Sequence, residues 1–152
     1  VFLEPMLGAG GVLAARPEFL REVIAATRAA GAVFVLDEVQ TFRMSTGGLQ
    51  QVFGVEPDLT LFGKFIGGGF PVGAVGGRAE IMQVFDASKL RVYHSGTFNA
   101  NPITMAAGNV TVRDLTADAI RHMEQLAERF RTGIMAAAAR LGAHGTGLLP
   151  KA

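Results

Sequence analysis

The chain has 152 residues, of which 49% are hydrophobic, and its formal net charge at pH 7 is +1. These values predict one domain with a substantial core, and they exclude a disordered chain and a protein that binds nucleic acid through its net charge. No apolar run approaches the roughly 18 residues that a membrane helix needs, and a chain without cysteine has no disulfides or thiolate metal sites. We therefore expect neither a membrane nor a nucleic-acid partner.

The N-terminal part of the sequence predicts two strands separated by a helix. Residues 1–3 have a short strand pattern, and a loop is expected at residues 6–12. Residues 17–31 combine a proline in the first turn, apolar residues at helical spacing and a glycine at the end. The next strand, at residues 33–36, completes the strand–helix–strand crossover that a parallel sheet requires.

The sequence after residue 40 predicts three further strands and four helices. A polar loop at residues 41–48 and a short helix at 49–53 precede three expected strands, at 59–62, 71–76 and 92–94. Helices are expected at 78–85, 102–115 and 116–141, the last with Thr116 as its cap. After Gly142 the pattern predicts a loop and the start of an unpaired strand, and the chain begins on Val1 rather than methionine. We therefore expect a piece of a longer protein.

Charged residues follow two of the predicted strands. Asp37 and Glu38 come after the strand at 33–36, and Lys64 precedes three consecutive glycines. Ligands in open α/β sheets bind at this end of the strands. Asp37 is a candidate partner for a cationic ring nitrogen, although an ordinary loop acid is the favoured interpretation when the residue is taken alone. Lys64 is a candidate Schiff-base amine, and a surface lysine is an equal alternative.

Residues 95–97 and the helix start at Pro102 form a second candidate site. Hydroxyls, backbone amides and the helix dipole could cradle a phosphate there, and a plain capping turn is an equal interpretation. The three histidines, one of them beside this loop, are scattered along the sequence, so we expect no metal centre.

Four motifs in a fixed order identify a family. They are LEP at residues 3–5, LDEV at 36–39, GKFIGGGFPVGAVGGR at 63–78 and HSGTFNANPITMAAG at 94–108. Together they resemble the class III (omega-type) aminotransferases, which use pyridoxal 5'-phosphate (PLP), and most of all the branch of glutamate-1-semialdehyde 2,1-aminomutase and the β-amino-acid aminotransferases. The resemblance implies an α/β fold of fold type I. Residues 1–115 would be part of the PLP-binding large domain, with a mostly parallel sheet flanked by helices, and residues 116–152 a linking helix and the start of the C-terminal small domain.

The resemblance also implies a role for each site residue. Lys64 would form the Schiff base with PLP and would move a proton between the substrate and the cofactor. Asp37 would bond the pyridinium nitrogen, Val39 would pack on one face of the ring, and Gln40 would lie near its phenolic oxygen. Thr97 would bind the cofactor phosphate across the interface of a homodimer, in the partner's site.

The implied activity is amino-group transfer by a cytoplasmic transaminase or aminomutase that acts on an amino-acid or amino-ketone substrate. Glu4 would be the family's EP glutamate, which gates substrate binding through an ion pair. The segment DEVQTFRMSTGG is one residue shorter than in many members. The family's upstream phosphate turn and ring-stacking aromatic are absent from these 152 residues, so we expect the chain alone to be inactive.

Two other classes of protein fit some of the same residues. One is a non-catalytic fragment or oligomerisation module that retains the fold. The other is a lysine-dependent aldolase or decarboxylase, which would use Lys64 without Asp37.

Overall fold

The computed structural model of the chain describes residues 1–86, 88–89 and 91–142. The chain forms two compact units, Val1–Leu115 and Thr116–Ala152. Their assignment to the large and small domains of a transferase stays a prediction. The loop and strand predicted after Gly142 lie outside the described residues.

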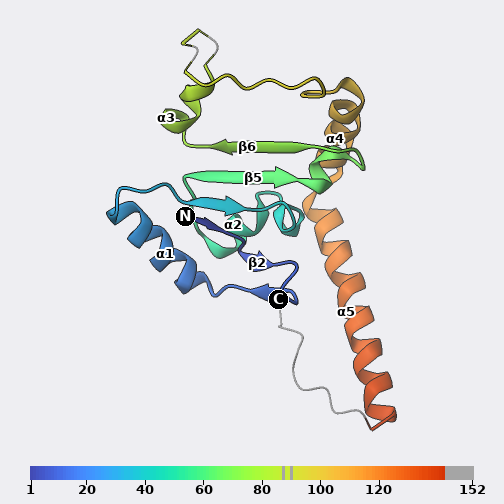
Figure 1. The fold of residues 1–152 in the computed structure, drawn as a ribbon. Coiled ribbons are helices and arrows are strands. Elements are labelled where there is room, and N and C mark those ends of the chain that lie inside the picture. The colour runs from blue at the N-terminus through green and yellow to red at the C-terminus, as the bar shows by residue number, and fades with distance from the viewer. Residues whose placement is uncertain (87, 90, 143–152) are drawn as a thin grey trace. The chain divides into compact units, whose positions relative to one another are not determined.

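A four-stranded sheet forms the centre of the first unit (Figure 1). Its strands lie in the order β1 (Phe2–Leu3), β4 (Val35–Asp37), β5 (Leu59–Gly63) and β6 (Gly73–Gly77). The first three strands are parallel, whereas β6 runs antiparallel to β5. Helix α1 (Pro17–Ala29) connects the adjacent parallel strands β1 and β4. The predicted crossover and the α/β fold are therefore confirmed, with β6 as an outer strand that runs antiparallel.

The core of this unit lies between α1 and one face of the sheet. Leu20 of α1 and Leu36 of β4 are completely buried, as is Phe34 immediately before β4. Each such side chain contributes about 1.5–3 kcal/mol when it leaves water. Helix α1 begins at Pro17, where the missing amide breaks no helical hydrogen bond. Its apolar face therefore packs on β4 and fixes the strand that ends at Asp37.

Short elements complete the first unit, and one long helix makes up the described part of the second. The first unit also contains β2 (Met6–Leu7), β3 (Leu13–Ala14), η1 (Phe42–Met44), α2 (Gly48–Phe53), η2 (Lys64–Gly67), α3 (Ala79–Met82), η3 (Gln83–Phe85) and α4 (Pro102–Asp114). In the second unit, α5 (Ala117–Arg140) begins at Thr116, whose hydroxyl accepts the Ala119 amide as predicted. Within the described ranges, no helix is long and apolar enough to span a membrane.

The structure corrects several sequence-based expectations. The loop expected at residues 6–12 contains strand β2, which pairs antiparallel with β3. The strand expected at 33–36 is shifted to Val35–Asp37, because the Phe34 amide binds a side chain, Asp58, instead of a neighbouring strand. The strand expected at 92–94 is wrong, since the Val92 amide bonds to Val84 and these residues join no sheet. The helix expected at 78–85 is divided into α3 and η3.

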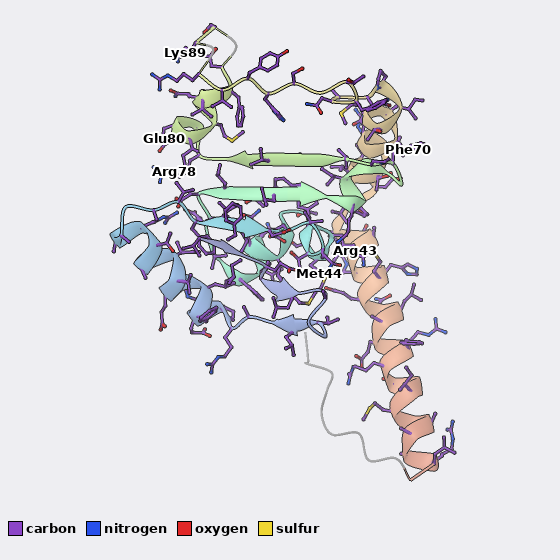
Figure 2. All side chains as sticks on the ribbon, viewed as in Figure 1. Arg43, Met44, Phe70, Arg78, Glu80 and Lys89 are labelled. Carbon is purple, nitrogen blue, oxygen red and sulfur yellow. The ribbon has the colours of Figure 1, made fainter. Side chains whose placement is uncertain are left out.

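One buried acid ties these elements together at the start of β5. The Asp58 carboxylate accepts the Phe34 amide at 2.9 Å and binds Arg28 of α1 at 3.0 Å and Arg78 at 3.1 Å. Arg78 lies where β6 ends and α3 begins (Figure 2). Burial alone would raise the pKa of the Asp58 carboxyl. The hydrogen bonds from the Phe34 amide, Arg78 and Arg28 outweigh burial and hold this pKa below its ordinary value.

We expect Asp58→Asn to lower the free energy of unfolding of the whole protein by about 1–3 kcal/mol at pH 7, since both arginines are partly screened by solvent. The folded-state pKa lies below its ordinary value of 3.8. The contribution of the carboxylate is therefore complete above that value and is lost as the pH falls through the folded-state pKa. Urea unfolding at pH 7 and at acidic pH measures both effects. A difference between the two proteins that does not shrink in acid contradicts this explanation.

Candidate active site

The strands β4 and β5 deliver the predicted acid and amine to the same edge of the sheet. Asp37 is the last residue of β4, and Lys64 directly follows β5. Both strands point toward this edge (Figure 1). Asp37 lies beside Leu61 in the parallel register, so Lys64 is three residues further along the chain, just after the end of β5. The spacing of strands and residues in a sheet puts the two backbones roughly 10 Å apart, a distance that two side chains and a pyridine ring can span.

The carboxylate of Asp37 is half-buried, and one of its two oxygens accepts a hydrogen bond. Its Oδ1 atom accepts the amide of Val39 at 2.9 Å, which orients the carboxyl group. In the part of the chain that the structure describes, no hydrogen bond reaches Oδ2. The arrangement leaves one carboxylate oxygen for a donor such as a ring N–H.

Two glycines let the residues after Asp37 lie against the backbone. A Cβ on Gly63 would be 3.3 Å from Cγ1 of Val39, so Val39 covers the residue directly before the lysine. The Gln40 side chain occupies the space that a Cβ on Gly8 would need. The Gly8 amide in turn donates to the Glu4 carboxylate at 3.1 Å. Glu4 therefore has a role in the hairpin turn, and its expected role as a gate stays a prediction.

Lys64 has an unusual backbone conformation. Its φ angle is 47°, in the left-handed region that residues with a side chain seldom occupy. Such strain costs of the order of 1–3 kcal/mol and is concentrated at functional sites. The side chain itself is exposed. Val12 and Ala100, which lie in turns, also have positive φ angles, so the conformation of Lys64 marks the tight turn after β5.

Helix α4 holds the turn that carries Lys64. Gly108 of α4 lies directly against the carbonyl oxygen of Ile66 in η2. Gly68, with a φ of 60°, follows η2, and a Cβ there would be 2.6 Å from the backbone of Ala107. The sequence motifs at residues 63–78 and 94–108 thus meet through backbone contacts that only glycine permits. Their contact fixes the position at which the lysine leaves β5.

Thr97 lies apart from these residues. It sits in an exposed turn before α4, and within the described residues it shares no hydrogen bond with Asp37 or Lys64. The nearby Asn101 side chain accepts the Ile103 and Thr104 amides, which is the capping interaction considered for this loop. The role of Thr97 in phosphate binding stays a prediction.

Two hollows on the first unit, of about 930 and 1120 Å³, are lined by neither Asp37 nor Lys64. The smaller hollow lies near Arg21, Arg28 and Arg78, whose guanidinium groups already bind acidic side chains.

Comparisons with known proteins agree with the motifs. The family model described as "Aminotransferase class-III" matches residues 1–142. A glutamate-1-semialdehyde 2,1-aminomutase from Anaeromyxobacter sp. (strain Fw109-5) is 45% identical over 141 residues, which are 91% of this chain and 32% of the relative. An omega-transaminase from Sphaerobacter thermophilus has a TM-score of 0.89 at 46% identity and covers 93% of this chain and 33% of its own. A structure described as "Transaminase with PLP bound" has a TM-score of 0.88 at 39% identity, with 93% and 34% covered. The chain spans about a third of the length of these relatives.

We expect a glycine-to-alanine substitution to lower the stability at Gly108, in the contact between α4 and η2, and to raise it at Gly133 in α5. Gly108→Ala forces the new methyl group against the Ile66 carbonyl, so we expect the whole protein to lose about 1–3 kcal/mol of unfolding free energy. Gly133→Ala in α5 is the matched control, because no atom of the described residues outside the surrounding helix backbone lies within 4 Å of its Cβ position. There alanine favours the helix by about 0.5–1 kcal/mol. Chemical unfolding measures both changes, and equal effects at the two glycines contradict the role given to Gly108.

Proposed function

We propose a function from the premise that this chain belongs to the class-III aminotransferase family. The whole protein is a PLP-dependent enzyme that transfers amino groups on an amino-acid or amino-ketone substrate, as a transaminase or as a glutamate-1-semialdehyde-type aminomutase. The observation that carries the proposal is the placement of Asp37 and Lys64 at the same ends of adjacent parallel strands.

The residues at this edge fit the chemical groups of PLP. Asp37 would accept the ring N–H at Oδ2, while Oδ1 stays bound to the Val39 amide. Val39 would cover one face of the ring, and Gln40 would lie at its phenolic oxygen. The ε-amine of Lys64 would hold the aldehyde carbon.

Each side chain then has a distinct task. When bound, PLP supplies a cationic ring that accepts the electron pair of a breaking bond at the substrate Cα. The Asp37 carboxylate would keep the ring nitrogen protonated, because a nearby anion favours the charged form of its partner. Once the substrate amine has replaced the Lys64 amine at the aldehyde carbon, the freed Lys64 amine would take a proton from the substrate Cα and return it at a neighbouring carbon.

The same proposal extends to the assembly. Thr97 would bind the cofactor phosphate in the partner's site of a homodimer. Its exposed position supports a role in a second copy's site. We also expect the whole protein in the cytoplasm.

Two alternatives receive less support. A non-catalytic module would not need an acid and an amine at the same ends of adjacent parallel strands. A lysine-dependent aldolase or decarboxylase would not need an acid with a free oxygen beside that lysine. Transaminase and aminomutase differ in whether the whole protein requires an external amino acceptor.

Covalent labelling tests the proposal. PLP is added to the whole protein, the adduct is reduced with borohydride, and the digested peptides are weighed by mass spectrometry. We expect the label on Lys64, whereas Lys89, which is paired with Asp86 at 3.3 Å, serves as the internal control. Lys64→Arg removes the label and lowers kcat by about 10²–10⁴-fold, the range for a lost proton-transfer group. Equal labelling of Lys89, or no label in the whole protein, contradicts the proposal.

A further inference from the structure

Glu38, the neighbour of Asp37, is a buried acid that the proposed chemistry does not use. None of its surface is exposed, and a buried carboxylate is costly unless it is hydrogen-bonded. Its Oε1 atom accepts the Gln50 amide at 2.7 Å. Its Oε2 atom accepts the Leu49 amide at 3.0 Å and the Thr41 hydroxyl. Both oxygens are therefore engaged within the protein.

These bonds attach the start of α2 to the end of β4. The amides of Leu49 and Gln50 belong to the first turn of α2, where no helical carbonyl is available to them. Gly48 lies so close that a Cβ would be 2.6 Å from Oε1 of Glu38, and its φ is 79°. A glycine at this position lets the carboxylate reach the helix.

The backbone of Glu38 fixes the turn that follows β4. Its amide donates to the Leu61 carbonyl at 3.0 Å, which completes the pairing of Asp37 with Leu61. Its carbonyl accepts the amides of Thr41 and Phe42 at 3.2 and 3.0 Å. One residue thus joins β5, the turn of residues 38–42 and α2.

The turn of residues 38–42 carries the side chains expected at the PLP ring. The Val39 side chain packs against Gly63, directly before Lys64, and the Gln40 side chain packs against Gly8. The Val39 amide also orients the Asp37 carboxylate. A shift of this turn would therefore move the group that binds the ring nitrogen together with the group that covers the ring.

We propose that Glu38 is a positioning residue of the PLP site. Its buried carboxylate fixes the turn of residues 38–42 and so places Asp37 and Val39, without touching the cofactor itself. The inference rests on the proposed function, because it assigns the surroundings of the same site. Asp58, the buried acid at the opposite end of β5, provides a matched control, since its carboxylate stabilises the sheet away from this turn.

The test compares Glu38→Gln with Asp58→Asn in the whole protein. Replacing one carboxylate oxygen by an amide places a donor against donors. We expect faster hydrogen exchange at residues 39–50 of the PLP-free protein, a Kd for PLP raised about tenfold and a changed absorption maximum of bound PLP. Asp58→Asn lowers the unfolding free energy but leaves the Kd within about twofold and the absorption maximum unchanged.

A milder pair of variants covers the case in which Glu38→Gln does not fold. Thr41→Val removes one donor to the Glu38 carboxylate at nearly constant volume, and Thr41→Ser keeps that donor. We expect Thr41→Val to raise the Kd for PLP about threefold and to change the absorption maximum in the same direction. Thr41→Ser restores the values of the unsubstituted protein.

The outcomes separate the inference from the proposed function. An unsubstituted whole protein that does not bind PLP overturns both. If the unsubstituted protein binds PLP, an unchanged Kd and absorption maximum in Glu38→Gln and Thr41→Val overturn the role of Glu38 alone. An equal rise of the Kd in Asp58→Asn overturns it as well, because general destabilisation then explains the effect.

Discussion

The parallel pairing of β4 with β5 is the interaction on which the candidate site depends. Its register puts Asp37 beside Leu61 and so brings the acid and Lys64 to one edge. A slip of one residue would turn Asp37 to the opposite face of the sheet. The pairing ends at the hydrogen bond from the Glu38 amide to the Leu61 carbonyl, and the Glu38 carboxylate binds the start of α2.

Close backbone contact is the second constraint around the site. The strained Lys64 is followed by a turn that α4 holds through Gly108, and it is preceded by Gly63 under Val39. A Cβ at Gly108 would collide with the Ile66 carbonyl, whereas a Cβ at Gly63 would require a small shift of the Val39 side chain. These glycines thus lie where elements distant in sequence approach one another.

The sequence predicted the features that depend on neighbouring residues. Helix α1, the crossover to β4 and the position of Asp37 and Lys64 at the C-terminal ends of two strands follow from local apolar patterns and turn residues. Features that depend on distant partners were missed or wrong. The donors to the Glu38 carboxylate lie as far as 12 residues away, and those to Asp58 as far as 30. The strand expected at residues 92–94 has a suitable pattern but joins no neighbouring strand.

A crystal structure of the whole protein with PLP bound is the most direct test of the pairing of Asp37 and Lys64 across one ring. We predict that the pyridine nitrogen lies within about 2.7–3.2 Å of Oδ2 of Asp37, with the Lys64 amine at the aldehyde carbon and Val39 on one face of the ring. A pyridine nitrogen bound by a different side chain, or a ring that Asp37 and Lys64 do not share, would contradict the proposed site.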